Sequence, residues 1–341
     1  MMITVTAVAL VVGAMVSGYY KALKPPPPKL CGSPNGPPIT SPRVKLNDGR
    51  HLAYREDGVP KQKAKYKIIV VHGFGSSKEQ RLSAPKDLVE ELGIYFLHFD
   101  RAGYGESDPY PSRSVKSEAF DIEQLADKLN IDKFYVLGSS LGGYPIWSCL
   151  KYIPHRLLGA ALVVPFVNLW WPCLPANIAR ESFEVLPKQY QHTYRVARYV
   201  PWLLYWWMTS KWFSHLRIQS QLNTLVFTQK DLEIEKKLQE VYFGQEKIEQ
   251  QGAYDSVFRD LMVTYGKWEF DPLDIANPFP NNEGSVYFWQ GYQDKIIPYK
   301  ISRFLSEKLP WMKYHEVADG GHMFFFEPHM CASMLKTFLL N

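Results

Sequence analysis

The feature that most constrains this chain is the segment Gly138–Gly142, with the sequence Gly-Ser-Ser-Leu-Gly, between a strand-like run and a helix-like run. Residues 133–137 have the length of a buried strand, and residues 141–152 are apolar with few breaks, as in a buried helix. The two elements must be joined by a sharp turn, in which a Cβ at either glycine would clash. Such a turn presents the Ser140 hydroxyl above the end of the strand, with a helix N-terminus behind it. The segment therefore predicts an exposed serine nucleophile.

Strand-like and helix-like runs alternate around this turn. After a hairpin over residues 44–54, further strands are expected at 68–71, 94–99 and 157–164, and helices at 85–92 and 114–129. This alternation predicts an α/β protein with a mostly parallel central sheet and helices on both faces. His72, Asp100 and Ser140 each follow a predicted strand, so we expect them at the same edge of the sheet, where sites of such folds form.

The alternation stops at residue 165 and resumes near residue 281. Residues 165–280 are rich in large aromatic side chains and predict several helices without a clear strand. We interpret them as a helical lid inserted between two parts of one core, residues 43–164 and 281–341. Most of these aromatics are expected to pack the lid itself, and a few to line an apolar pocket or touch lipid. The second part predicts strands at 286–289 and 313–317 and helices at 299–308 and 328–340.

The N-terminus predicts a membrane anchor. Residues 1–20 contain no charged side chain and are long enough to cross a bilayer, and lysines follow them at positions 21, 24 and 29. Basic residues after the apolar run favour an anchor (residues 1–24) with the downstream domain on the cytosolic side, at the endoplasmic reticulum. A cleaved signal peptide with secretion, or a buried N-terminal helix, is the alternative. Residues 25–42 are rich in proline and predict a linker, either a stalk or a segment wrapped on the domain.

Composition excludes several other classes. The formal net charge is only +5, so a nucleic-acid partner is not expected. The four cysteines contain no Cys-x-x-Cys pair, and the nine histidines no His-Glu-x-x-His. We therefore expect no metal site and no cofactor.

The order of the motifs along the chain resembles the α/β-hydrolase superfamily. It runs His72-Gly73, then the Asp100–Ser107 segment, then the Gly138–Gly142 turn, then Asp294, and then Gly321-His322. The resemblance covers nearly everything from residue 43 onward except the lid. The proline-rich stretch, followed by Asp48-Gly49-Arg50, also resembles a plant group of membrane-anchored α/β-hydrolases.

The residue types and the resemblance together predict a catalytic triad of Ser140, His322 and Asp294. A serine hydroxyl is a weak nucleophile at neutral pH and needs a base within hydrogen-bond reach. His322 is the candidate base, because the pKa of histidine near 6.5 suits proton transfer. Asp294 would orient the imidazole, and the nucleophile–acid–histidine order of the superfamily is met.

The remaining site residues are expected to act around the triad. The backbone N–H groups of Phe74 and Leu141 should form the oxyanion hole. His72 should order the oxyanion loop, Gly73 should let the backbone approach the reacting group, and Asp100 should bind local backbone N–H groups. Gly138 and Gly142 allow the turn that carries the nucleophile.

Three functions fit this set of residues. A serine at the turn, where epoxide hydrolases and haloalkane dehalogenases carry aspartate, favours acyl transfer. We favour a serine esterase or lipase that cleaves an apolar ester through an acyl-enzyme on Ser140. An acyltransferase that uses the same acyl-enzyme, or a ligand receptor that retains the triad, is the alternative.

Overall fold

The structure is a computed structural model, and it describes residues 23–216, 218, 223–241 and 245–340. An eight-stranded sheet forms its centre, in the order β1-β2-β4-β3-β5-β6-β7-β8. Its strands are β1 (Arg43–Lys45), β2 (His51–Gly58), β3 (Tyr66–Val71), β4 (Ile94–Phe99), β5 (Phe134–Ser139), β6 (Leu157–Val163), β7 (Val286–Gly291) and β8 (Met312–Val317). Strands β3 to β8 are parallel, and β2 runs antiparallel to both of its neighbours. The predicted mostly parallel sheet is thus confirmed.

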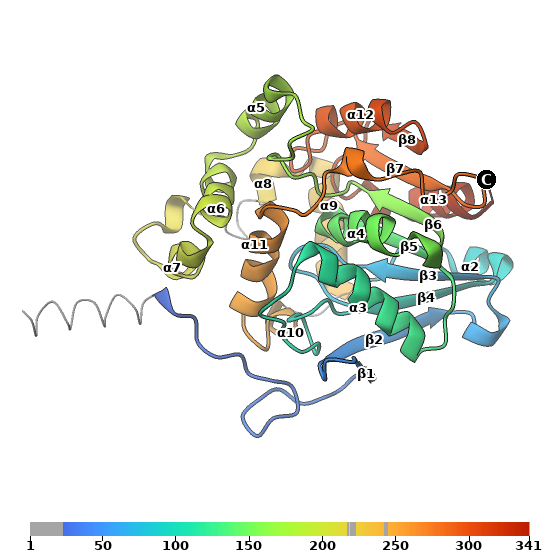
Figure 1. The fold of residues 1–341 in the computed structure, drawn as a ribbon, viewed down its shortest axis with the longest axis horizontal. Coiled ribbons are helices and arrows are strands. Elements are labelled where there is room, and N and C mark those ends of the chain that lie inside the picture. Colours follow the sequence, from blue (N-terminus) through green and yellow to red (C-terminus); the bar gives the residue numbers. More distant parts are fainter. Residues whose placement is uncertain (1–22, 217, 219–222, 242–244, 341) are drawn as a thin grey trace, which may run out of the picture.

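Helices cover both faces of this sheet (Figure 1). They are α2 (Lys86–Leu92), α3 (Val115–Lys128), α4 (Gly143–Tyr152), α12 (Tyr299–Lys308) and α13 (Pro328–Leu340). Strand β3 shows why both faces need cover: Ile69 and Val71 join one apolar cluster with α3, α4 and α12, while Ile68 and Val70 join a second cluster with α2 and α13. Successive side chains of a strand point to opposite faces, so a run without polar residues must be buried on both.

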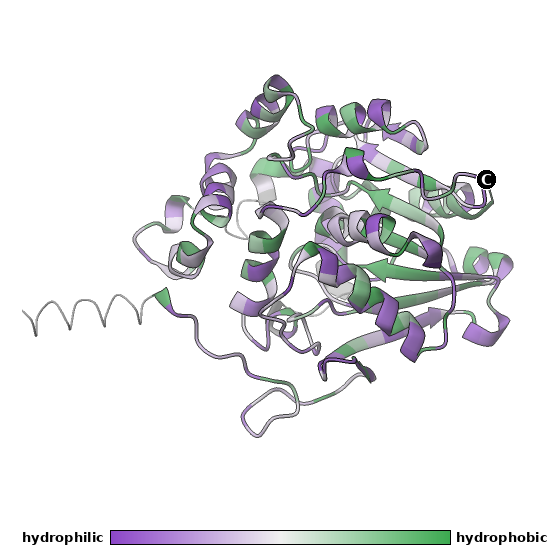
Figure 2. Ribbon diagram, in the orientation of Figure 1, coloured by the Kyte–Doolittle hydropathy of each residue, from purple (hydrophilic) through white to green (hydrophobic). Residues whose placement is uncertain are grey.

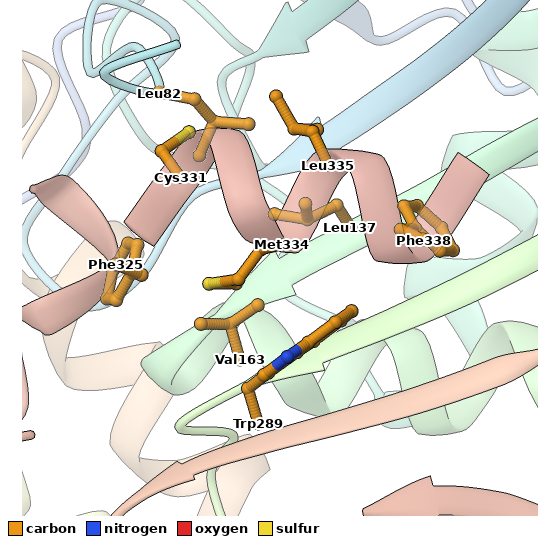
Figure 3. A pocket seen from close by; sticks show the side chains of 9 residues that line it. All are labelled: Leu82, Leu137, Val163, Trp289, Phe325, Cys331, Met334, Leu335 and Phe338. Atoms are coloured by element: carbon orange, nitrogen blue, oxygen red, sulfur yellow. The ribbon is translucent and has the colours of Figure 1, made fainter. Parts of the chain in front are cut away.

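The α13 side of the sheet is closely packed. A cavity of about 10 Å³ lies between α13 and the strands. The apolar side chains that line it are drawn in Figure 3. These are Leu82, Leu137, Val163, Trp289, Phe325, Cys331, Met334, Leu335 and Phe338. A space of this size is near the minimum for one water molecule, and its lining offers no polar partner. We therefore regard it as a packing defect and not as a binding site.

The segment between β6 and β7 is helical and lies beyond one end of the sheet (Figure 1). It contains α5 (Ala176–Glu184), α6 (Lys188–Tyr199), α7 (Leu204–Thr209), α8 (Asn223–Val226), α9 (Gln229–Val241), α10 (Gln245–Ile248) and α11 (Arg259–Tyr265). Parallel strands β5 and β6 end beside this segment, so it stands where the site is expected. Trp171 packs edge-on against Trp147 of α4 and Phe166, so part of the aromatic content belongs to the main core.

The proline-rich segment packs on the globular domain. Lys29 N–H donates to the Gln251 carbonyl at 2.9 Å, and the buried Cys31 lies beside it. Farther along, Thr40 and Ser41 hydrogen-bond to the Glu106 carboxylate at 2.5–3.0 Å. From residue 29 onward the segment is thus wrapped on the surface, as in the second of the two expected arrangements. Residues 1–22 of the predicted anchor (residues 1–24) lie outside the described residues, among which no helix is long and apolar enough to cross a membrane.

A buried ionic cluster joins the lid to the core. Asp260 of α11 is fully buried and accepts two hydrogen bonds of 2.6 Å from Arg101, which follows β4. Arg113 also pairs with Asp260, and the Tyr104 hydroxyl donates to it at 2.7 Å. Burial alone would raise the pKa of the Asp260 carboxyl, but the two guanidinium groups hold it well below its usual range. Asp260 therefore stays ionised and balances two buried cations.

Replacing Asp260 by alanine should lower the free energy of unfolding by about 3–5 kcal/mol, because the buried Arg101 would lose its counter-ion and Arg113 would keep only Glu118. Urea denaturation of purified protein measures this difference. Asp319→Ala is the matched control, because Asp319 forms a solvent-exposed ion pair with Lys230 that should contribute little to stability. Equal losses in the two variants would contradict a role for the buried cluster in stability.

Candidate active site

The turn after β5 has the geometry that the sequence predicts. Ser140 has a backbone φ of +53°, in the left-handed region that non-glycine residues rarely adopt. A Cβ on Gly138 would lie 2.2 Å from the Gly142 carbonyl oxygen, and one on Gly142 would lie 2.3 Å from the Val71 carbonyl oxygen. Both glycines are therefore required for α4 to start this close to β5 and β3. The Ser140 side chain is raised above the strand ends as a result.

Three residues from distant parts of the chain meet at this turn. The Ser140 hydroxyl lies 2.9 Å from Nε2 of His322, and Nδ1 of His322 lies 2.7 Å from an oxygen of Asp294. Ser140 follows β5, Asp294 follows β7 and His322 follows β8, so the shared edge of the sheet brings them together. The arrangement is that of a nucleophile, a base and an orienting acid.

Asp294 is held in place by its own turn. One carboxylate oxygen accepts N–H bonds from Ile296 at 2.8 Å and Ile297 at 2.9 Å, which leaves the other oxygen facing His322. The side chain is completely buried. These bonds fix the carboxylate plane before any substrate arrives, as pre-organisation of the imidazole requires.

The electrostatic surroundings keep His322 basic. Burial alone would lower the pKa of the imidazole, but the adjoining Asp294 and the nearby Asp231 outweigh burial and hold its pKa above the usual value. A base with a raised pKa takes a proton from the serine more readily. The same shift means that His322 becomes protonated, and unable to accept that proton, at a higher pH than an ordinary histidine.

The loop after β3 approaches the nucleophile closely. A Cβ on Gly73 would lie 3.3 Å from the Ser140 Cβ, so only a glycine passes here without displacing neighbours. Nδ1 of His72 lies 2.9 Å from the Gly73 carbonyl, and Nε2 accepts the Arg101 N–H at 3.1 Å. Burial and the nearby Arg101 hold the pKa of His72 well below its usual value, so its ring stays neutral and can accept that bond. These two hydrogen bonds order the loop, and neither of them involves Ser140, His322 or Asp294.

Each predicted oxyanion donor belongs to a residue that follows the nucleophile or its close neighbour Gly73 in the sequence. Phe74 directly follows Gly73 in the loop, and Leu141 directly follows the nucleophile at the start of the turn into α4. Asp100 lies deeper: its oxygens accept the Lys78 N–H at 2.8 Å and the Glu106 N–H at 3.0 Å. The backbone role expected for Asp100 is therefore present, together with a buried ion pair to Lys78 that the sequence did not reveal.

A residue of the lid also binds the histidine loop. Asp231, in the first turn of α9, is 1% exposed and accepts the backbone N–H of His322 at 3.1 Å and of Met323 at 2.7 Å. It also accepts the N–H and hydroxyl of Thr228, which starts the helix. A Cβ on Gly321 would lie 2.0 Å from the Asp231 carboxylate, so that glycine makes room for the contact. The sequence analysis missed Asp231, although Thr-x-x-Asp before a helix signals a capping residue.

Phe227 adds an apolar contact to this connection. Its ring stacks on the His322 imidazole with a centroid distance of 6.2 Å and an interplanar angle of 16°. Phe227 and Asp231 belong to one short stretch of the lid, so the lid touches both the ring and the backbone of His322. A shift of this part of the lid would therefore also shift the His322 imidazole.

A larger hollow lies at the base of the lid, away from these residues. It has a volume of about 540 Å³ and is lined by Asn168, residues 170–173, Arg198, residues 266–271, Leu273 and Asp274. Neither Ser140 nor His322 lines it or the small cavity beside α13. The site is thus defined by its hydrogen bonds and not by the size of a cavity.

Comparison with known proteins identifies the family. The family model described as the alpha/beta hydrolase fold matches residues 66–328, most of the chain. The chain belongs to the α/β-hydrolase family. The match spans β3 to the start of α13 and includes all three residues that meet at the turn.

Curated relatives of this α/β-hydrolase are similar over shorter stretches. Abhydrolase domain-containing protein abhd-5.2 of Caenorhabditis elegans is 37% identical over 120 residues, which are 33% of this chain and 26% of that protein. The sn-1-specific diacylglycerol lipase ABHD11 of Danio rerio is 30% identical over 76 residues, or 22% of this chain and 24% of the relative. The alignments thus span only about a quarter of the length of these two relatives.

Solved structures extend the similarity of fold to nearly the whole α/β-hydrolase chain. An enol-lactonase from Burkholderia xenovorans LB400 gives a TM-score of 0.62 at 16% identity, covering 88% of this chain and 100% of that one. A thermophilic esterase from Thermogutta terrifontis gives 0.57 at 18% identity, covering 88% and 98%. At such identities the likeness establishes the fold alone. The closer resemblance to a plant membrane-anchored group stays a prediction.

Changing Asp231 to asparagine should move the acid limb of the pH–rate profile to lower pH. His322 loses activity as it is protonated, and removing a carboxylate that raises its pKa lowers that pKa. We also expect kcat for a soluble p-nitrophenyl ester to fall by about tenfold with KM little changed, because the histidine loop loses an anchor. Steady-state kinetics across pH measure both effects.

Asp319→Asn is the control for this variant, because its ion pair with Lys230 joins the same helix to the same loop at the surface, at 2.9 Å. It should leave the acid limb in place. An unshifted limb in Asp231→Asn would mean that Asp231 does not act on His322.

Proposed function

We propose that this chain is a serine hydrolase that cleaves a carboxylic ester of an apolar small molecule or lipid. The observation that carries the proposal is the 2.9 Å contact between the Ser140 hydroxyl and Nε2 of His322. A serine alone reacts slowly, and a base at this distance can take its proton as the bond to the substrate carbonyl forms.

The proposed reaction has two halves. In the first, Ser140 attacks the ester carbonyl, its proton passes to His322, and the tetrahedral oxyanion is bound by the N–H groups of Phe74 and Leu141. The C–O bond to the alcohol then breaks, and His322 returns the proton to the departing alcohol. In the second, water attacks the acyl-enzyme by the same route and releases the acid. Asp294 stabilises the imidazolium throughout without itself taking a proton.

Apolar side chains beside the triad support an apolar substrate. The Phe227 ring lies over one face of His322, and Phe74, at the tip of the oxyanion loop, is 38% exposed. Aromatic surface at a site mouth favours ligands that leave water on binding. Activity against p-nitrophenyl esters of graded chain length would define the preferred acyl group.

An acyltransferase is the second candidate, since an alcohol can replace water in the second half-reaction. The observation that favours this candidate is the contact between Asp231 of the lid and the backbone of His322. A lid that lies against the base can select whether water or an alcohol reaches the acyl group. Product analysis in the presence of added alcohols separates the two. A receptor that retains the triad without turnover is tested by a fluorophosphonate probe, which labels a competent serine.

Ser140→Ala should lower kcat for p-nitrophenyl butyrate by at least about 10⁴-fold and abolish probe labelling, with the fold unchanged because the side chain only shrinks. His322→Ala should be about as damaging, and the double variant no slower than either one, because the residues act as a unit. Persistent labelling of Ser140→Ala would move the nucleophile elsewhere, with the adjacent Ser139 the first candidate. Ser139→Ala serves as the control and should keep most of the activity.

We also propose that the protein is anchored in a membrane through residues 1–20, with the catalytic domain facing the cytosol at the endoplasmic reticulum. The uncharged run and the lysines after it support this location. The full-length protein should stay in the membrane fraction after alkaline carbonate extraction, and its C-terminus should be digested by protease added to sealed vesicles. Release by carbonate, or a mature N-terminus near residue 20, would contradict the anchor.

A further inference from the structure

A segment in the middle of the lid has an unusual charge. Residues 185–230 contain six Lys or Arg residues and no Asp or Glu, although the whole chain has 34 acidic residues among 341. The same segment contains four tryptophans, at positions 202, 206, 207 and 212. A long basic, aromatic and acid-free segment within one chain points to a partner with negative charge and an apolar interior.

The side chains of this segment that reach solvent are of the same kinds. Between residues 188 and 216, all exposed residues but one are basic, histidine or aromatic; they are Lys188, Arg195, Tyr199, Trp202, Thr209, Lys211, Trp212 and His215. Trp212 is 81% exposed, Tyr199 64% and Trp202 59%. Single exposed aromatics are ordinary, whereas several close together in one segment mark an interaction site.

Helix α6 sorts these residues onto one stripe. Lys188, Arg195 and Tyr199 are seven and four residues apart, so they project from the same side of the helix. The opposite side of the helix, with Tyr190, is buried. Trp202 follows directly in the next turn. We call Arg195, Tyr199, Trp202, Lys211 and Trp212 the basic aromatic face.

The charges on this stripe contact neutral groups. The Arg195 guanidinium lies 4.4 Å from the centre of the Phe183 ring, and the Lys188 ammonium lies 3.5 Å from the Gln191 amide oxygen. Neither contact neutralises a positive charge. The charges therefore remain available to an anionic partner.

The N-terminal segment joins the body beside this part of the lid. Lys29 bonds to Gln251, three residues before a helical turn (η7, Tyr254–Phe258) that packs against α7, where the Tyr205 and Tyr254 rings are 6.0 Å apart. Lys29 lies six positions after residue 23, and at about 3.1 Å per residue an extended proline-rich chain of this length spans roughly 20 Å. The described chain thus begins, at residue 23, on the side of the body that carries α7 (Figure 1).

We propose that the basic aromatic face docks on the surface of a bilayer that contains anionic lipid. Tryptophan and tyrosine favour the interface between headgroups and acyl chains. Each Lys or Arg near an anionic surface strengthens binding by about fivefold. The hydropathy colours of Figure 2 show polar and apolar residues mixed along α6 and α7, as an interfacial surface requires. This docking adds to the proposed hydrolase activity and does not depend on it.

The test uses the full-length chain in nanodiscs of phosphatidylcholine with or without phosphatidylserine, some carrying brominated acyl chains that quench nearby tryptophan fluorescence. We expect quenching in the anionic nanodiscs that is largely lost in Trp202→Tyr/Trp212→Tyr, which keeps the rings aromatic. Arg195→Glu/Lys211→Glu, removal of phosphatidylserine, or high salt should each reduce this quenching by about twofold or more.

Lys128→Glu is the matched charge-reversal control, because Lys128 is exposed at the end of α3, away from the lid. It should leave quenching unchanged. Equal quenching in the wild type and in Trp202→Tyr/Trp212→Tyr would overturn the proposal. A dimer in lipid-free detergent that dissociates in Arg195→Glu/Lys211→Glu would also overturn it and assign the face to a second copy of the chain. Because no outcome uses activity, an inactive enzyme would not be mistaken for a failed docking surface.

Discussion

The constraint on which the site depends is the left-handed turn at Ser140. A non-glycine residue in this conformation costs about 1–3 kcal/mol, and it persists only where the surroundings fix it. Here Gly138 and Gly142 let β5, β3 and α4 approach closely, and this close packing holds Ser140 in the left-handed conformation. The sheet then supplies the rest, because β7 and β8 end at the same edge and deliver Asp294 and His322 to the raised hydroxyl.

Much of this could be predicted from the sequence, because it is written in short patterns. Buried runs such as residues 68–71 predict central strands, and the glycines around Ser140 predict the turn. The ionic cluster of Arg101 and Asp260 could not be predicted, because the two residues are 159 positions apart and neither stands in a sequence pattern that indicates a buried charge. The sequence around Asp231 carries only the pattern of a helix cap, and the fold alone brings His322 to it. Local rules identify such a residue but not its distant partner.

The lid is bonded to the loops that carry the proposed site residues. Asp260 fixes α11 to the loop that carries Arg101, and Arg101 in turn donates to the Gly73 carbonyl at 3.2 Å in the oxyanion loop. Asp231 fixes α9 to the histidine loop on the other side of the nucleophile. The lid thus contacts both halves of the catalytic machinery that we propose, and a shift of the lid would disturb base and oxyanion hole together. Its exposed surface, basic and aromatic, offers a place where a membrane could bias that position.

The central claim is that Ser140 forms a covalent acyl-enzyme, and rapid acid quench with mass spectrometry tests it most directly. Mixing the protein with excess p-nitrophenyl ester should give a burst of about one p-nitrophenolate per protein molecule if deacylation is the slower half. The quenched protein should gain the mass of one acyl group, on the peptide that contains Ser140. Steady turnover with the acyl group on another residue would contradict the account.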